Sequence, residues 1–205
     1  FIWDTPNGVS AWTLTERLIN KMKESGCYTL NFAVETGNQY VMDNIIRKPL
    51  RLEKVKRLVD YAHKINLNVG IFLVMGMPGE TEEQMWDSFR LSKELGVYFP
   101  HISIATPYPG SKLYDICVEN KYFSDGFSLD DLFTRSFCIS TKDWNGEKLR
   151  RIYAKGQIFL FMSYFKRHPI KFINRIIRKF FTNPGRLFRY IYIIVTNKKD
   201  LSNLR

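Results

Sequence analysis

The sequence predicts an α/β fold with parallel strands that alternate with helices, followed by a basic helical segment. Two observations predict the first part: strand-like and helix-like segments alternate through the first 120 residues, and the strands are nearly continuous apolar runs. Such runs are typical of a parallel sheet covered on both faces. A third observation predicts the second part: residues 149–205 carry 14 Lys and Arg against one acidic residue, whereas residues 1–148 carry 17 against 19. The net charge of +11 therefore belongs to the last quarter of the chain.

Capping patterns place the helices. Thr13 and Glu16 have the spacing of a capping box and predict a helix that ends at Gly26, and Thr81 with Gln84 predicts a second box and a helix to about residue 95. Between them, a helix that begins after residue 49 places one apolar stripe toward the core, formed by Leu52, Val55, Leu58, Val59 and Ala62.

Strands are predicted at residues 29–34, 69–75 and 101–105, with residues 1–3 as the end of an earlier strand and 111–119 as a further helix. These make four β-α units, fewer than a closed eightfold barrel of about 250 residues needs. The pattern fits a smaller open sheet or the back part of a barrel, and the abrupt start on Phe1 favours a front part upstream. We expect the α/β part at 1–123, a linker at 124–148 and a basic tail at 149–205.

Four loops follow these strands, at residues 4–8, 35–38, 76–81 and 106–111, where ligands bind in parallel β-α folds. In the third loop, Gly76 and Gly79 let a ligand approach the backbone and Pro78 stiffens the turn. Acidic residues at the following helix start disfavour a phosphate and suit a cation or an amine. Taken alone, a plain turn before a capped helix explains this loop better.

Glu35 is a carboxylate at the end of an apolar strand, where it needs a ligand or a partner. It fits a ribose diol or an amine, and it equally fits a salt bridge to a neighbouring helix. A third hypothesis pairs it with Asp4 for hydrolytic acid-base chemistry, which requires the two carboxylates to lie about 5 to 10 Å apart.

Neither a metal site nor a membrane span is expected within the chain. Cys27, Cys117 and Cys138 are far apart, and His63 and His101 are isolated. The longest apolar runs are far shorter than the roughly 18 residues that a transmembrane helix requires.

Taken in order, residues 33–37, 72–81 and 105–111 resemble the back half of the radical S-adenosylmethionine (radical SAM) superfamily, most closely members with an upstream cobalamin-binding domain. The resemblance implies that residues 1–123 are strands 3 to 6 of a partial, TIM-like (β/α)6 barrel. It implies an enzyme that reductively cleaves S-adenosylmethionine on a [4Fe-4S] cluster for methylation, cyclisation or rearrangement. The expected partners are a small-molecule or lipid-like substrate and an electron donor, in the cytoplasm.

The resemblance also implies a cofactor-binding set. Glu35 and Thr36 would contact the ribose or amino-acid part of S-adenosylmethionine. The loop 76–79 would lie along the adenosine, with Met75 and Met77 as its apolar neighbours. The eight residues are Glu35, Thr36, Gly37, Met75, Gly76, Met77, Pro78 and Gly79.

One departure from the family concerns the cluster. Its C-x-x-x-C-x-x-C motif is absent, and none of the three cysteines has that spacing. The cluster ligands and any cobalamin domain are therefore expected upstream, and these 205 residues alone are expected to be inactive. The alternative from another class is a non-catalytic scaffold or docking module.

The basic tail has its own pattern. At about 100° per residue, residues 170–181 separate into an apolar half rich in Ile and Phe and a half with four basic residues. This composition fits a helix at an anionic membrane surface or one packed against another domain. RNA binding is disfavoured, because the aromatic residues share the apolar face instead of alternating with the basic ones.

Overall fold

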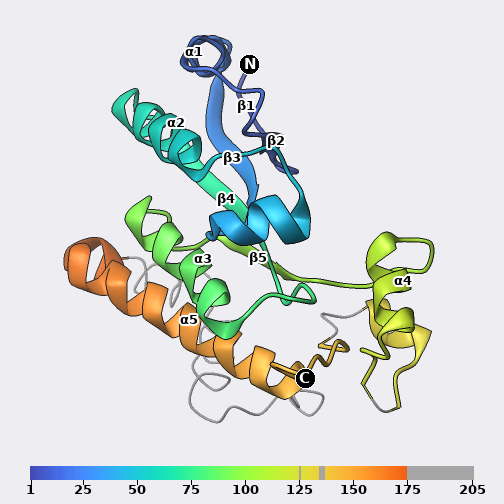
Figure 1. Ribbon diagram of the computed structural model, residues 1–205. Helices are drawn as coiled ribbons and strands as arrows, with labels where there is room; N and C mark the ends of the chain where they lie inside the picture. Colours follow the sequence, from blue (N-terminus) through green and yellow to red (C-terminus); the bar gives the residue numbers. More distant parts are fainter. Residues whose placement is uncertain (125, 134–136, 175–205) are drawn as a thin grey trace. The chain divides into compact units, whose positions relative to one another are not determined.

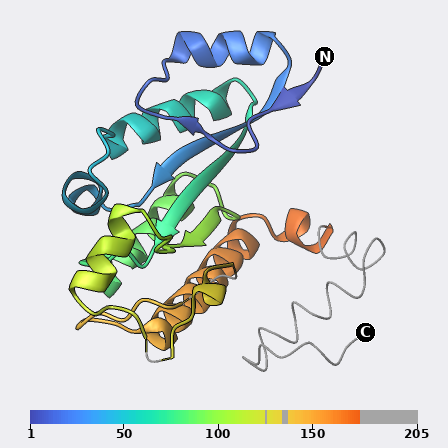
Figure 2. The ribbon, with the colours of Figure 1, turned by 90° about the vertical axis from the view of Figure 1, so that its right-hand side faces the viewer.

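The computed structural model describes residues 1–124, 126–133 and 137–174. The chain divides into two compact units, Phe1–Leu160 and Phe161–Arg205. The first contains every strand of the described part and is shown in Figures 1 and 2. The predicted amphipathic segment 170–181 lies largely outside the described residues.

A parallel sheet forms the first unit. It consists of β1 (Trp3–Asp4), β2 (Val9–Ser10), β3 (Cys27–Glu35), β4 (Asn68–Met75) and β5 (His101–Ile104). The order is β1-β3-β4-β5, with β2 beside the carboxyl half of β3, and every pairing is parallel. This is the predicted half-barrel.

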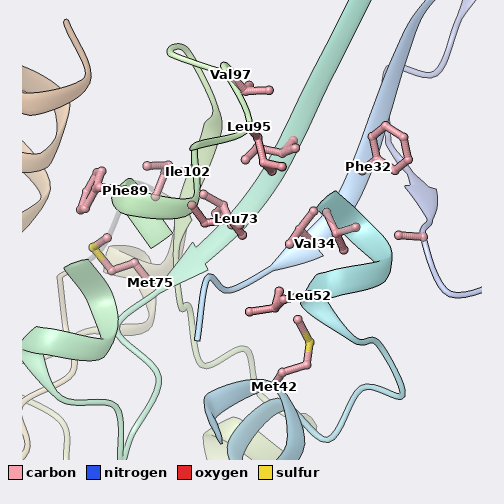
Figure 3. Packing of buried hydrophobic residues seen from close by; sticks show 14 of the residues in the cluster. Phe32, Val34, Met42, Leu52, Leu73, Met75, Phe89, Leu95, Val97 and Ile102 are labelled. Atoms are coloured by element: carbon pink, nitrogen blue, oxygen red, sulfur yellow. The ribbon is translucent and has the colours of Figure 1, made fainter. Parts of the chain in front are cut away.

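Helices cover one face of this sheet, as Figures 1 and 2 show for α1 (Glu16–Glu24), α2 (Leu52–Lys64) and α3 (Glu82–Glu94). Alternate residues of β3 and β4 are fully buried beneath them, and Figure 3 shows Val34, Leu73 and Met75 within this core. All five residues of the predicted α2 stripe are buried.

The other face of the sheet corrects the expectation that both faces are covered. The alternate positions Phe72 and Val74 on β4 are only half-buried, and His101 and Ser103 on β5 are exposed. The Phe72 and His101 rings stack there with centroids 4.7 Å apart. The inner face of the half-barrel is therefore open among the described residues.

Of the two predicted capping boxes, the one at α3 is observed and the one at α1 is not. Thr81 and Gln84 form the predicted capping box of α3. At α1 the predicted box is wrong: the Thr15 hydroxyl accepts from the Leu18 amide, whereas the Thr13 hydroxyl donates to the Ser10 carbonyl. Thr13 is used in the preceding turn, so the helix begins later than expected.

Two further segments complete the loops. A π-helix, η1 (Val41–Ile46), follows β3 and was not predicted. After β5 come the expected helix, α4 (Lys112–Glu119), which Ser111 caps, and a 3-10 helix, η2 (Leu129–Phe133).

The last helix, α5 (Gly146–Arg167), crosses the boundary expected at residue 148. The compact unit continues to Leu160, because Leu149, Ile152 and Leu160 are buried in its core and Gly156 lies against the Phe89 ring. The first turns of the predicted tail therefore belong to the α/β unit. No helix among residues that the structure describes is long and apolar enough to cross a membrane.

Candidate functional site

A cleft of about 440 Å³ lies at the carboxyl ends of the central strands, the edge at which parallel β-α folds bind ligands. Segments from β2, β3 and β4 and from the turn after η1 contribute to it. Its lining is Trp12, Glu35, Ile46, Arg47, Lys48, Pro49, Val74 and Met77.

Glu35 enters the cleft through an irregular end of β3. Ala33 pairs with Phe72 and Glu35 with the next residue, Leu73, so one residue of β3 is extra at a bulge. Glu35 adopts φ +75°, a left-handed conformation that costs a non-glycine residue about 1 to 2 kcal/mol. A strained backbone conformation persists only where surrounding contacts stabilise it, and here Lys48 makes those contacts.

Lys48 stabilises the strained carboxyl end of β3 through two hydrogen bonds. Its Nζ donates to Glu35 Oε1 at 2.6 Å and to the Ala33 carbonyl at 2.8 Å, and it lies 5.3 Å from the centre of the Trp12 ring. The side chains of Lys48 and Glu35 are only 12% and 25% exposed, so water screens this pair less than a surface pair. Within the described part of the chain, Glu35 Oε2 makes no hydrogen bond.

A second cation borders the same cleft. Arg47 ends η1 in a left-handed conformation and has no ion-pair partner among the described residues. With Lys48 and Glu35, it gives the lining two positive charges and one negative charge. The remaining walls are apolar, so the cleft combines a carboxylate acceptor, a free cation and surface for a flat ring.

The loop after β4 contributes Met77 to the cleft and is shaped by glycine. Gly76 has φ +84° and lies so close to Leu149 that a Cβ would come within 2.5 Å of its Cδ2 atom. Gly79 has φ +90° beside Ile45. Only glycine adopts both conformations without strain, as the sequence predicts.

Glu80 closes this loop from inside. Its Oε2 accepts from the backbone amides of Gly76 at 2.9 Å and Met77 at 3.2 Å, and its own carbonyl accepts from Trp144 Nε1 at 2.7 Å. The side chain is buried, and Oε1 has no hydrogen-bond partner in the described structure. Burial raises the pKa of Glu80 from 4.5 to about 7, although the two amides oppose that rise.

The residues after Glu35 turn away into the protein. Thr36 is fully buried, and its hydroxyl accepts from the Asn38 amide. The Gly37 amide donates to Ser88 Oγ of α3, and a Cβ on Gly37 would lie 2.3 Å from the Asp87 carbonyl oxygen. These residues fix the strand end against α3.

The structure thus divides the eight expected cofactor residues. Two of them, Glu35 and Met77, line the cleft. The others do not line it: Met75, Thr36 and Gly76 are buried, Pro78 is half-buried, Gly37 packs tightly against the Asp87 backbone, and Gly79 is exposed with a positive φ.

Sequence reasoning missed Trp12, Lys48 and Arg47. Trp12 follows the alternation of residues 9–11, which could have marked a strand end, and Lys48 precedes a proline in a long connection. Nothing local indicated that the two side chains meet. Glu80 was interpreted as part of an acidic helix start, and its burial was not foreseen.

The pairing of Asp4 with Glu35 for hydrolysis is contradicted. Asp4 pairs with Thr29, six residues before Glu35 on β3, which separates the two backbone positions by about 20 Å along the strands at about 3.3 Å per residue. Asp4 accepts from the Tyr28 hydroxyl at 3.0 Å and raises the pKa of that phenol. Residues 5–8 follow β1, as expected, but they lie beside the middle of β3, because Thr5 is bonded to Asn31 and the chain then resumes as β2.

The three cysteines do not form a cluster site. All are buried; Cys27 begins β3, at the opposite end from the cleft, Cys117 lies in α4, and Cys138 lies in the segment before α5. Burial raises the pKa of Cys117 to about 11, which disfavours the thiolate that binds iron. No group of three or more His, Cys, Asp or Glu within the described ranges could hold a metal ion.

Comparisons with known proteins place the chain among radical SAM proteins. Residues 5–92 match the family model of the Radical SAM superfamily. The chain is 33% identical over 160 residues to cytidylyl-2-hydroxyethylphosphonate methyltransferase of Streptomyces wedmorensis, covering 75% of this chain and 30% of that protein. It is 30% identical over 150 residues to an uncharacterized methyltransferase of Pyrococcus horikoshii, covering 73% of this chain and 32% of that protein.

A solved structure shows the same fold. Coproporphyrinogen III oxidase of Escherichia coli, a radical SAM enzyme, superposes with a TM-score of 0.52 at 18% identity, covering 76% of this chain and 31% of that chain. This chain spans about 30% of the length of the curated relatives it matches.

Proposed function

The chain belongs to the radical SAM superfamily, and we propose that its first unit forms the S-adenosylmethionine side of the barrel of a radical SAM methyltransferase. The observation that carries this proposal is the cleft at the end of β3 and β4, where Lys48 holds Glu35 in a strained conformation. The family match covers every residue that lines this cleft.

The lining fits S-adenosylmethionine in its chemistry. The cofactor carries a flat base, a ribose diol, an ammonium and a carboxylate. The apolar walls at Trp12, Val74 and Met77 suit the base. Glu35 Oε2 is free to accept from the diol or the ammonium, and Arg47 is free to pair with the carboxylate. When bound beside a reduced [4Fe-4S] cluster, S-adenosylmethionine supplies the radical chemistry of the family.

The chain's own residues position the polar groups of the cleft and exclude water from it. Lys48 holds the Glu35 carboxylate in place through its hydrogen bond to Oε1, so the acceptor needs no rearrangement when the ligand arrives. Met77 and Val74 exclude water from one wall, which strengthens each polar contact. Glu80, Thr36, Gly37 and Gly76 hold the loop and strand end that carry these groups.

The described residues offer no set of side chains that could bind the [4Fe-4S] cluster. We therefore place the cluster ligands outside these 205 residues. The chain alone is expected neither to assemble a cluster nor to cleave S-adenosylmethionine. Iron and sulfide reconstitution followed by iron analysis and detection of 5′-deoxyadenosine tests this. A stoichiometric cluster with cleavage would contradict it.

The reaction class we propose is methyl transfer to a small-molecule substrate, because two of the matched relatives are methyltransferases. An external electron donor would reduce the cluster in the cytoplasm. The use of cobalamin stays a prediction from the sequence resemblance. A peripheral contact with the inner membrane face is a second proposal, favoured by the exposed apolar and basic residues near the end of the described chain.

Binding of S-adenosylmethionine to the full chain, followed by isothermal calorimetry, tests the role of the cleft. We expect Glu35→Gln to weaken binding by about 10-fold, the loss of one charge-assisted hydrogen bond. Glu53→Gln removes an exposed carboxylate on α2 and serves as the matched control. Absence of binding, or equal loss in both variants, would favour a non-catalytic scaffold.

A further inference from the structure

Residues 161–173 of the second unit carry apolar side chains that remain exposed. Phe161, Met162 and Phe165 belong to the last turns of α5 and are 38%, 44% and 38% exposed. Ile170 and Ile173, beyond Pro169, are 74% and 50% exposed. We call these five residues, together with Lys166, Arg167 and Lys171, the tail surface.

The tail surface is ordered by its own contacts. Phe172 folds back onto α5, with ring centroids 4.7 Å from Phe161, 5.0 Å from Phe165 and 6.1 Å from Tyr164. The Phe172 amide donates to the His168 carbonyl at 2.9 Å. The aromatic rings therefore hold one another in place, yet their outer edges are not covered by the described residues.

Apolar and basic groups are arranged side by side. At about 100° per residue, Phe161, Met162 and Phe165 fall within one arc of about 100° on α5, and Lys166 lies next to that arc. Lys166, Arg167 and Lys171 are exposed, and no Asp or Glu occurs between Glu147 and Asp200. An apolar stripe flanked by Lys166, in a stretch whose charged residues are all cations, complements a surface with an apolar interior and anionic head groups.

We propose that the tail surface docks on an anionic lipid bilayer, with the apolar residues inserted at the head-group boundary and the three cations on lipid phosphates. The basic charge of the tail surface favours lipid over a partner protein. A partner protein would need acidic groups around an apolar groove, whereas an anionic leaflet presents acidic head groups and an apolar interior at every point of its surface. This inference deepens the peripheral contact proposed above and does not depend on radical chemistry.

Co-sedimentation of the full chain with vesicles tests the proposal. We expect binding to vesicles of phosphatidylcholine mixed with phosphatidylglycerol, little binding to phosphatidylcholine alone, and release at high salt. Equal binding to both vesicle types, or binding to neither, would overturn the proposal. The second outcome would point to a protein partner.

Two variants locate the surface. Lys166→Gln, Arg167→Gln and Lys171→Gln together should weaken binding at least about 10-fold, because each cation near an anionic surface contributes about 5-fold. The control replaces Arg17, Lys64 and Lys112, three exposed cations of the first unit, by Gln and lowers the net charge equally. An equal loss in the control would overturn the assignment to this surface.

A second triple variant, Met162→Gln, Ile170→Gln and Ile173→Gln, tests insertion without touching the packed rings. It should also weaken vesicle binding at least about 10-fold. Unchanged binding would overturn the insertion. Binding of S-adenosylmethionine, measured in parallel, should be unaffected by either variant, so a failure here is separable from a failure of the cleft.

Discussion

Replacing Glu80 by Gln should flatten the pH dependence of stability. In the folded chain the pKa of Glu80 is about 7, against 4.5 ordinarily. At low pH the carboxyl is protonated in both states and its burial is not penalised. As the pH rises above about 4.5, the unfolded chain loses the proton while the folded chain retains it until about pH 7. The free energy of unfolding therefore falls with rising pH across this window.

The size of the effect follows from the pKa difference. Each pH unit between the two pKa values is worth about 1.4 kcal/mol, so Glu80 alone should cost about 3 kcal/mol between pH 4.5 and about 7. Glutamine has the same shape and can still accept from the Gly76 and Met77 amides, but it does not titrate. Any constant effect of the new amide group cancels when the same variant is compared at two pH values.

The assay is urea unfolding at a series of pH values, followed by tryptophan fluorescence, because all four tryptophans lie in the first unit. Glu53→Gln removes an exposed carboxyl and is the control. The difference between the native chain and Glu80→Gln should change by about 3 kcal/mol across the window, and that for the control by much less. Parallel curves for the native chain and Glu80→Gln would refute the reasoning.

Three further outcomes are expected. Lys48→Met should lower the free energy of unfolding by about 1 to 3 kcal/mol in chemical denaturation, because it leaves Glu35 strained and unpaired, and should weaken S-adenosylmethionine binding; an unchanged midpoint would contradict the role of the pair. Gly37→Ala should destabilise by about 1 to 3 kcal/mol or prevent folding, since its Cβ meets the Asp87 backbone, and thermal melting measures this; a native melting temperature would show that the contact can relax. The Cys117 thiol should resist a thiol reagent at about pH 8 until urea is added, because burial holds its pKa near 11; rapid labelling of the native chain would contradict its burial.

The sequence predicted what local patterns determine. The α2 stripe and the Thr81 capping box depend on residues within a turn or two of each other, and both are confirmed. The predicted Thr13 capping box is wrong because Thr13 and Thr15 are both candidates for the N-cap. The Thr13 hydroxyl is used in the preceding turn, and Thr15 caps the helix.

What could not be predicted depends on distant parts of the chain. Trp12 and Lys48 lie 36 residues apart and meet only in the folded chain, and the Glu80 carbonyl accepts a hydrogen bond from Trp144, 64 residues later. Glu35 had three interpretations: a ligand contact, a salt bridge to a neighbouring helix, and the pairing with Asp4. The structure shows a salt bridge, but to Lys48 in the turn after η1 instead of to a helix, and the proposed function uses the oxygen that the bridge leaves free.

The contact between Leu149 and Gly76 connects the loop after β4 to the start of α5, 73 residues later in the sequence. A protein shortened at Lys148 would lose the side chain that fills the space beside this loop, although it would keep every matched motif residue. Likewise, a chimera that received the loop from a relative would need the relative's counterpart of Leu149 as well. The loop after β4 and the first turns of α5 should therefore be exchanged or trimmed only together.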